Sequence, residues 1–434
     1  MSGATSATSL SQGFFTRATQ LLDTAKESSH KLSPHLLHLS SRLTDLPCIV
    51  HINQKRIFSP IMPGKYGQKE TSSQELFYRA ILSLRLVPLG CLALTSGLAS
   101  MPLRFFGIHL QRNEQPFSLF QLPQKGKSLP KEKKASLFSL NVCGIGGGFP
   151  LTHGGILPWN QRFNQIINLV KDKDPDFVCL QEIHDTVLGA RLRFTLTEKG
   201  YSTFCYNMSP QNFGADSGLF FATKYDIQNP SFTPFSKKDV LNEVRHVNKG
   251  FFSVELIDNS TNKPFCRIYT THLQHSQDDS NPTKNEQNVR KNQMNQILLH
   301  MQEKHKENAL PTLLTGDLNM GNIEFSQHNP NFYNAFLEKN SENPFTAATQ
   351  LLKAAAKNLS LSSSEKSSSG KKTHLLDHTL VWKPTDASSD SYKKALSYTE
   401  SISTFDLEKP DKALSDHYAL ISELSFPDFS SAVC

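Results

Sequence analysis

Residues 312–319 read TLLTGDLN, and residues 415–424 read SDHYALISEL. In the first stretch Asp317 and Asn319 follow an aliphatic run, whereas in the second Asp416 and His417 precede one. Short aliphatic runs favour β-strands, and α/β folds place many of their catalytic side chains just beyond strand ends. The two stretches therefore predict two strands of an α/β domain whose polar ends contribute to a functional site.

Other predicted strands on both sides of these stretches also have polar residues at their ends. These residues are Asn141 in SLFSLNV, Glu182 in DFVCLQEI, His272 in FCRIYTTHL and Asp377 just before HTLVWK. Helical patterns such as WNQRFNQIINLVKDK separate the strands. Strands and helices in this mixed order predict an α/β sandwich of two sheets over residues 136–428.

The chemistry of this set is that of carboxylates, amides and imidazoles without a thiolate. Hard oxygen donors select Mg²⁺, or Mn²⁺, rather than zinc. The set suits in-line attack of water on a phosphate ester, with Glu182 binding the cation and Asn141 and Asp416 as further candidate ligands. His417 would take the proton from water, while Asp377 fixes its ring and stabilises the imidazolium.

The remaining polar residues of the set would contact the phosphate or the water. Asn319 and His272 would donate hydrogen bonds to the phosphoryl oxygens as negative charge develops on them. Asp317 would orient the attacking water, and Asn141 would hold Glu182 and the phosphate in place. Each of these residues is ambiguous when taken singly, so the prediction depends on their order along the chain.

That order resembles the endonuclease/exonuclease/phosphatase superfamily, whose members carry Asn, Glu, His, Asp-x-Asn, Asp and a final Ser-Asp-His in turn. The resemblance covers residues 136–428, about two-thirds of the chain. It implies a deoxyribonuclease I-like α/β sandwich and a metal-dependent phosphoric ester hydrolase. Carried over by position, the functional set is Asn141, Glu182, His272, Asp317, Asn319, Asp377, Asp416 and His417.

Several shorter stretches resemble the Mg²⁺-dependent neutral sphingomyelinases within that superfamily. They are Ser217–Gly218–Leu219, Lys249–Gly250, Thr271–His272–Leu273–Gln274 and the helix VRKNQMNQI with Arg290 and Gln293. This resemblance implies hydrolysis of sphingomyelin, or a related phospholipid, to ceramide and phosphocholine. It also makes Asp216, directly before Ser217, an additional candidate site residue.

Recognition of a choline headgroup would need aromatic faces for cation–π contacts. The candidates are Tyr206, Phe213, Tyr333 and Trp382, and the sequence does not choose among them, because an aromatic residue is more often part of the core. A Ser/Lys-rich stretch at 358–373 is expected to be a flexible insertion that alters the rim of the site.

Three other interpretations stay open. An inositol-polyphosphate phosphatase of the same fold would carry a Trp-Cys-Asp-Arg signature, whereas LLDHTL stands at 375–380. An endonuclease would bind the phosphate backbone, but residues 135–434 hold 29 Lys and Arg against 32 Asp and Glu, so no nucleic-acid partner is expected. The third is a catalytically inactive, membrane-tethered adaptor, although no member of the catalytic set is missing.

A hydrophobic segment at 75–110 lies upstream of the catalytic domain. Within it, 18 uncharged residues lie between Arg85 and Arg104. This length is at the lower limit for a bilayer span of about 18–20 residues. We expect the segment to associate with a membrane, as a span or as a re-entrant or interfacial helical hairpin; a buried helix of a soluble domain is the alternative.

The rest of the upstream chain is basic, since residues 1–134 hold 17 Lys and Arg against 7 Asp and Glu. Residues 1–74 form a polar region without the pattern of a secretory signal peptide. Residues 111–135, rich in Pro, Gly and Lys, are predicted to be a linker. A basic flank beside an apolar segment favours an anionic membrane surface as the partner.

The seven cysteines are scattered and form no Cys-x-x-Cys pair. This pattern is typical of free thiols in a reducing compartment. We therefore expect the protein at the cytoplasmic face of a membrane; a bacterial protein exported to host membranes without a classical signal peptide is the alternative. The sequence does not predict an oligomeric state.

Overall fold

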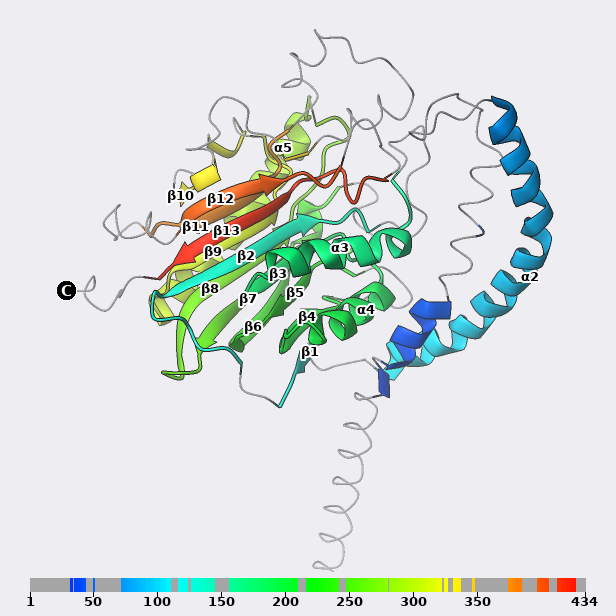
Figure 1. Ribbon diagram of the computed structural model, residues 1–434. Helices are drawn as coiled ribbons and strands as arrows, with labels where there is room; N and C mark the ends of the chain where they lie inside the picture. Colours follow the sequence, from blue (N-terminus) through cyan, green and yellow to red (C-terminus); the bar gives the residue numbers. More distant parts are fainter. Residues whose placement is uncertain are drawn as a thin grey trace, which may run out of the picture.

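The computed structural model has two mixed β-sheets packed face to face, with helices on their outer sides (Figure 1). The predicted two-sheet α/β fold is therefore confirmed. The structure describes residues 32–33, 35–43, 50, 72–110, 116–123, 126–144, 156–209, 216–241, 247–279, 281–321, 324–326, 331–336, 346–347, 374–384, 396–405 and 412–426. The expected insertion at 358–373 and the candidate Phe213 lie outside these residues.

The first sheet has seven strands in the order β1-β4-β5-β3-β2-β13-β12. In that order their bounds are Ser118–Gln121, Thr203–Tyr206, Phe220–Thr223, Phe177–Gln181, Lys134–Asn141, Ala419–Ser425 and Leu396–Ile402. β2 and β3 are parallel, and the other neighbours are antiparallel. β1 lies within the segment 111–135 that was expected to be a linker, and its pairing with β4 makes that part of the segment belong to the sandwich.

The second sheet has six strands in the order β10-β11-β9-β8-β7-β6. In that order their bounds are Phe332–Tyr333, Asp377–Trp382, Thr312–Asp317, Lys263–His272, Gly250–Asp258 and Asp226–Pro234. β8 and β9 are parallel, and the other neighbours are antiparallel. Each sheet thus has one parallel pair, and four predicted residues lie at or directly after the carboxyl ends of these pairs, namely Asn141, Glu182, His272 and Asp317.

The main core lies between the two sheets. Leu137 of β2 and Leu313 of β9 are buried there, whereas the next residues, Phe138 and Leu314, are buried on the outer faces. Successive side chains of a strand point to opposite faces, so both faces of these sheets are covered. Burial on both faces explains why these strands read as nearly continuous apolar runs.

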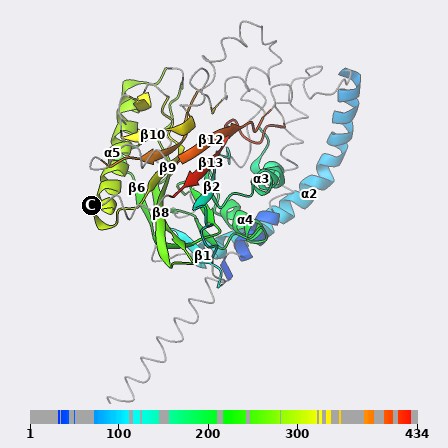
Figure 2. The ribbon, with the colours of Figure 1, turned by 60° about the vertical axis from the view of Figure 1, so that its left-hand side comes forward.

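Three helices cover the outer faces of the sheets (Figure 2). α3 (Trp159–Lys173) and α4 (Thr186–Thr197) pack on the first sheet, and α5 (Lys284–Glu307) packs on the second. Asp185 caps α4 by accepting a hydrogen bond from the backbone N–H of Val187. At the start of α5, Thr283 and Glu286 form a reciprocal capping box, which satisfies free N–H groups of the first turn.

The predicted hydrophobic segment lies in α2 (Ser72–Leu110), a single helix of 39 residues. The helix continues through Pro88 and Pro102, so the segment is not folded into a hairpin on itself. Residues Arg79–Ile108 are long and apolar enough to cross a membrane, and most of this stretch is not buried against the rest of the protein. By length and composition the helix fits the expected membrane segment.

The carboxyl-terminal part of α2 contacts the rest of the protein. Ser33 donates a hydrogen bond to the carbonyl of Gly107 at 2.7 Å. A Cβ added at Gly107 would lie 2.8 Å from Cδ2 of Leu37, so this glycine permits close packing of the two helical segments. Arg104 Nη2 also lies 3.1 Å from Oδ1 of Asp185, the residue that caps α4. These contacts join α2 to the catalytic sandwich.

Candidate active site

Polar residues of the predicted set meet at one end of the sandwich. Asn141 ends β2, His272 ends β8, Asp317 ends β9 and Asp377 begins β11. Asp317 pairs with His272 on one side and with Asp377 on the other. The strand alternation that buries Leu313 between the sheets also directs Asp317, four residues later, into that space.

Asn141 connects the two sheets at this end. Its Nδ2 donates hydrogen bonds to Oε1 of Glu182 and to Oδ2 of Asp317, both at 3.0 Å. Its Oδ1 accepts a hydrogen bond from the backbone N–H of Cys143 at 3.0 Å. Because Asn141 and Glu182 follow strands of the first sheet and Asp317 ends a strand of the second, this amide fixes the two carboxylates side by side.

The chain turns sharply after three of these strands. Cys143, Glu182 and Asn319 have φ angles of 50°, 64° and 51°. This left-handed conformation is unfavourable for residues with a Cβ, although asparagine tolerates it better than most. Non-glycine residues in this region concentrate at functional sites, where the surrounding structure stabilises them. The turns bring the side chains of the strand ends toward one another.

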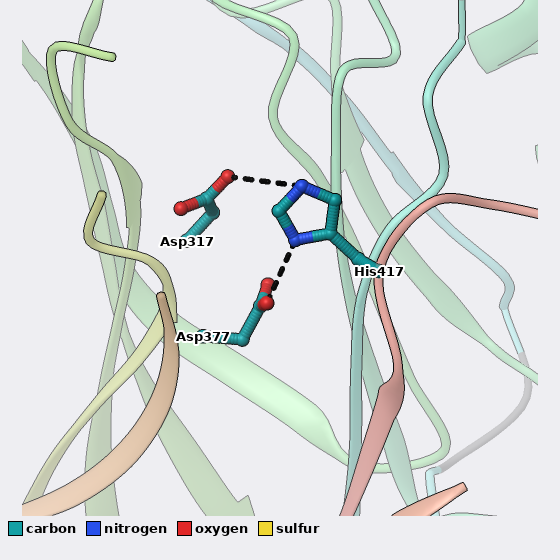
Figure 3. Close-up of side chains that lie close together, drawn as sticks. All are labelled: Asp317, Asp377 and His417. Atoms are coloured by element: carbon teal, nitrogen blue, oxygen red, sulfur yellow. Dashed lines mark hydrogen bonds and ion pairs between the residues drawn. The ribbon is translucent and has the colours of Figure 1, made fainter. Parts of the chain in front are cut away.

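His417 lies between two carboxylates (Figure 3). Its Nδ1 is 2.7 Å from Oδ2 of Asp377, and its Nε2 is 3.8 Å from Oδ2 of Asp317. Hydrogen bonding of Nδ1–H to a carboxylate selects the tautomer in which Nε2 accepts a proton. Asp377 therefore orients His417 so that Nε2 faces the carboxylate cluster.

The charges around His417 determine which form of its ring is favoured. Burial alone would lower the pKa of His417, but the charges of Asp377 and Asp317 and the hydrogen bond to Asp377 outweigh it and raise the pKa well above its usual value. Burial raises the pKa of Asp317 to about 6. These two carboxylates strongly stabilise an imidazolium at position 417.

His272 and Asn319 flank Asp317. Nε2 of His272 lies 3.6 Å from Oδ2 of Asp317, and its buried Nδ1 has no hydrogen-bond partner within the described part of the chain. Burial, reinforced by the charge of Lys249, lowers the pKa of His272 well below its usual value, so the ring is neutral. Asn319 donates its backbone N–H to Asp317 Oδ1 at 2.9 Å and its side-chain Nδ2 to the carbonyl of Leu273 at 3.2 Å.

The cluster around Asp317 brings together side chains of the types that bind a divalent cation, but its members differ from the predicted ligands Glu182, Asn141 and Asp416. In the described residues, one group of three ionisable side chains brings its ligand atoms within 4.8 Å of one another, namely Asp317, Asp377 and His417. Oδ1 of Asp377 is buried without a hydrogen-bond partner among these residues, and Glu182 lies beside Asp317 through Asn141. Buried carboxylates need compensation, and their hard oxygens suit Mg²⁺.

Asp416 directly precedes His417, and its charge is one of those that raise the pKa of the His417 ring. The same charge, like that of Glu182, contributes after burial to raising the pKa of the Cys143 thiol well above its usual range. Cys143 is therefore a neutral thiol close to both carboxylates. The structure thus brings Glu182 and Asp416, two of the three predicted metal ligands, to the same buried corner as Asn141.

Lys249 is a buried cation near the site. The sequence analysis singled it out only as part of the Lys249–Gly250 pair that resembles the neutral sphingomyelinases. It lies just before β7, and its Nζ donates a hydrogen bond to the carbonyl of Leu273 at 2.5 Å. Burial lowers the pKa of Lys249 to about 8, although the charges of Asp317 and Glu182 oppose this shift. The ammonium partly balances the carboxylates of the site.

The Ser-Gly-Leu stretch supports the segment that follows Glu182. Nδ1 of His184 lies 3.2 Å from the carbonyl oxygen of Asp216, and Oδ1 of Asp216 accepts the backbone N–H of Gly218 at 2.7 Å. Gly218 has a φ of 79°, and a Cβ added there would lie 2.5 Å from Cε1 of His184. Glycine is therefore required by both backbone conformation and space.

Arg290 and Gln293 of α5 hold the loop that follows His272. Gln293 accepts the backbone N–H of Gln274 at 2.9 Å. Arg290 donates a hydrogen bond to Ser276 at 2.7 Å and forms a 2.7 Å ion pair with Glu324. These two residues position the loop rather than contribute to the carboxylate cluster.

The aromatic candidates for choline binding divide between core and strand edge. Tyr206 is buried under α4, and Trp382 is buried under α5, where its ring contacts His305. Tyr333, at the end of β10, is only partly buried against the core between the sheets. Tyr206 and Trp382 are therefore core residues rather than headgroup contacts, in line with the more frequent role of buried aromatic residues.

Residues 138–417 match the sequence profile of the Endonuclease/Exonuclease/phosphatase family. The match spans more than half of the chain, and the chain belongs to this family. Members of the family are metal-dependent phosphoric ester hydrolases with a deoxyribonuclease I-like fold. The structure places most of the predicted residues, and the Asp-Asp-His group, at one end of this fold.

Several solved structures have a similar fold. D. rerio TDP2 complexed with a single-strand DNA product is 15% identical, with 67% of this chain and 98% of that chain covered and a TM-score of 0.46. Beta toxin from Staphylococcus aureus is 19% identical, with 66% and 99% covered and a TM-score of 0.47. The human nocturnin catalytic domain with bound sulfate is 18% identical, with 73% and 100% covered and a TM-score of 0.43. No curated protein sequence matches the chain.

Proposed function

We propose that the protein is a Mg²⁺-dependent phosphodiesterase that hydrolyses sphingomyelin, or a related phospholipid, to ceramide and phosphocholine. The observation that carries the hydrolytic part is the pair of His417 and Asp377, joined at 2.7 Å, with Nε2 of the ring facing Asp317. A positioned imidazole and carboxylate are the recurring means of removing a proton from water.

In the proposed reaction, His417 in its neutral form accepts a proton from water at Nε2; a cation held by the neighbouring carboxylates would favour this neutral form, because it offsets the charges that raise the pKa of the ring. The negative charges of Asp377 and Asp317 stabilise the imidazolium that forms, and Asp317 orients the water by accepting its other hydrogen. Neutral His272 and the amide of Asn319 donate hydrogen bonds to the phosphoryl oxygens as negative charge develops there. These donors lie on either side of Asp317, so water and phosphate would meet beside this carboxylate.

Glu182, with Asn141 beside it and Asp416 nearby, would hold the cation. When bound, a divalent ion supplies Lewis-acid stabilisation of negative charge on the phosphate and on the leaving oxygen. Asn141 keeps Glu182 beside Asp317, and Lys249 limits the repulsion among the carboxylates.

Two features support a phospholipid as the substrate. The stretches around Gly218, Lys249 and His272 resemble the neutral sphingomyelinases; Lys249 and His272 lie beside the carboxylate cluster, and Gly218 packs against His184. α2 supplies an apolar surface beside the sandwich, because Leu84 and Val87 are 80% and 73% exposed. Exposed apolar surface of this extent is unusual for a helix surrounded by water.

The membrane partner follows from the same helix. Arg85, which is exposed, lies at one end of the uncharged run, where an arginine side chain can reach lipid headgroups. Arg104 lies at the other end and is partly exposed beside its ion pair with Asp185. The five described cysteines are all free thiols, in keeping with the proposed location at the cytoplasmic face of a membrane. Residues 75–110 therefore form the proposed membrane-associating segment of the protein.

The experiment that tests this function is release of phosphocholine from sphingomyelin liposomes by the full-length protein, with Mg²⁺ and with EDTA. We expect release that requires Mg²⁺ and is lost in His417→Ala. Phosphate release from inositol polyphosphates, or cleavage of abasic DNA, without phosphocholine release would contradict the lipid assignment. Flotation with liposomes without turnover of any of these substrates would favour the adaptor.

A further inference from the structure

Arg162 occupies a position where the pattern of α3 favours an apolar side chain. Trp159, Phe163 and Ile166 are buried on one face of this helix, and Arg162 lies on the same face with 1% of its surface exposed. Burial of a guanidinium is costly unless its N–H groups are hydrogen-bonded. Among the described residues, Arg162 forms no ion pair with a carboxylate, so other groups must satisfy its N–H donors.

Backbone carbonyls from three separate segments satisfy this guanidinium. The acceptors are Leu157 (2.6 Å from Nε), Val142 (2.7 Å from Nη1), Leu414 (from Nη1) and Cys143 (2.6 Å from Nη2). Two of these carbonyls directly follow Asn141, and one directly precedes Ser415. Arg162 therefore connects the segment after β2 to the segment before β13.

The backbone itself does not make this connection. The ladder between β2 and β13 ends at the pair Ser139 and Leu420. Asn141 and His417 lie beyond that pair, so strand pairing does not set the distance between them. Ser415 provides one bond across the gap, because its Oγ donates to the carbonyl of Asn141 at 2.5 Å. Arg162 provides further bonds, because its Nη1 donates to the carbonyls of both Val142 and Leu414.

We propose that Arg162 is a positioning residue that sets the spacing between the Asn141–Glu182 half and the Asp416–His417 half of the catalytic centre. A guanidinium suits this role because its five N–H donors lie in one plane and point in fixed directions. A lysine ammonium has three donors on a flexible stem and cannot reproduce the arrangement. A test of this role by enzyme activity rests on the proposed function, whereas a test by hydrogen exchange of the two segments does not.

The test compares Arg162→Lys with Arg191→Lys in the full-length protein. Arg191 is a matched control because it is also buried against α3, with its guanidinium 4.4 Å from the ring centre of Phe163. The readouts are turnover of bis(p-nitrophenyl) phosphate with Mg²⁺, and hydrogen exchange of residues 137–144 and 412–420 without substrate.

Misplacement of a catalytic group by 1 Å can lower turnover by about 100-fold. We expect Arg162→Lys to lower kcat by about 30- to 100-fold with KM changed less than about threefold, and to accelerate exchange in both segments. Arg191→Lys should leave kcat within about threefold and should not accelerate exchange in residues 412–420.

Equal effects of the two variants, or unchanged exchange of residues 412–420 in Arg162→Lys, would overturn the proposal. Arg162→Gln serves as a second variant, because it retains two N–H donors without the charge. If neither variant at position 162 folds, the residue is a general requirement of the fold and the positioning role is refuted. Absence of turnover by the wild-type protein would refute the proposed function instead, since hydrogen exchange needs no substrate.

Discussion

Oδ2 of Asp377 lies 2.7 Å from Nδ1 of His417, although the two residues are 40 positions apart in the sequence. Asp377 begins β11 in the second sheet, and His417 lies two residues before β13 in the first, so the hydrogen bond crosses between the sheets. The bond fixes the orientation of the imidazole before any ligand arrives. Such preorganisation lowers the cost of reaching the reactive geometry.

Replacement of His417 tests its assignment as the general base. His417→Gln should lower kcat for phosphodiester hydrolysis by about 10²- to 10⁴-fold, because it removes the proton acceptor. Thermal unfolding and KM should change little. His300→Gln is the control, since His300 bonds Tyr269 under the second sheet, away from the cluster. Activity of His417→Gln near that of the control would show that another group removes the proton.

Removal of the cation should abolish activity and reduce stability. A ligand present at about 100 times its dissociation constant stabilises a protein by about 2.7 kcal/mol. We expect saturating Mg²⁺ to raise the Tm of the wild-type protein and to leave that of Glu182→Gln nearly unchanged. Glu423→Gln, at an exposed ion pair with Lys134, should respond as the wild type does. An equal Mg²⁺-induced shift in all three proteins would argue against Glu182 as a ligand.

Alanine substitutions at two glycines with positive φ can distinguish the cost of a steric clash from the cost of a strained backbone conformation. Gly218 and Gly200 have φ angles of 79° and 87°, but only at Gly218 would a Cβ meet another group, the ring of His184. Gly200→Ala should cost about 1–2 kcal/mol of unfolding free energy, for the left-handed backbone alone. Gly218→Ala should cost about 1–3 kcal/mol more, for overpacking. Denaturant unfolding measures both, and equal costs would contradict the predicted clash.

The pH dependence of stability should show the contribution of the buried, neutral ring of His378. Burial lowers the pKa of its ring to about 4, from the ordinary value of 6.5. Below pH 6.5 the unfolded chain binds a proton that the folded protein does not, so stability falls as the pH decreases from about 6.5 to 4. The full shift amounts to about 3 kcal/mol. In metal-free protein, His378→Gln should flatten this part of the stability curve, and an unchanged slope would place the responsible group elsewhere.

Membrane association should depend on the exposed apolar face of α2. A triple change of Leu84, Val87 and Leu94 to Ser should reduce flotation with anionic liposomes by at least tenfold, because each side chain contributes about 1.5–3 kcal/mol when fully buried in lipid. Leu299→Ser is the control, since Leu299 is an equally apolar, exposed side chain on α5. Equal flotation of the triple variant and the control would exclude α2 as the membrane contact.

Local pattern was sufficient to predict the sandwich and most members of the site. The strands that end in Asn141, His272 and Asp317 are largely apolar and have a polar residue at the end. They are largely apolar because both faces of each strand are buried. The predicted linker at 111–135 was partly wrong, because β1 is four residues long and is recognisable only through its pairing with β4. α2 was predicted as apolar, but its continuity through Pro88 and Pro102 was not.

Arg162 and Lys249 show what a one-dimensional pattern conceals. Both are charged residues at positions that the structure buries, and a charge in sequence ordinarily indicates a solvated surface. The sequence did contain a signal for Arg162, because this arginine falls on the apolar face of the helical pattern at 159–173. For Tyr206 and Trp382 the sequence offered both a core and a ligand role, and the structure places both residues in the core.

The sequence by itself determined which chemical groups are available, their order and the strands that end in them, since these depend on residue type and on the two-residue period of a strand. Only the tertiary structure decided that the Nδ1 of His417 meets Asp377, that Asn141 bridges Glu182 and Asp317, and that Arg162 joins two strand ends. Those contacts depend on sheet order, register and the left-handed turns after the strands. Such features arise from packing across the whole domain, which no local stretch of sequence encodes.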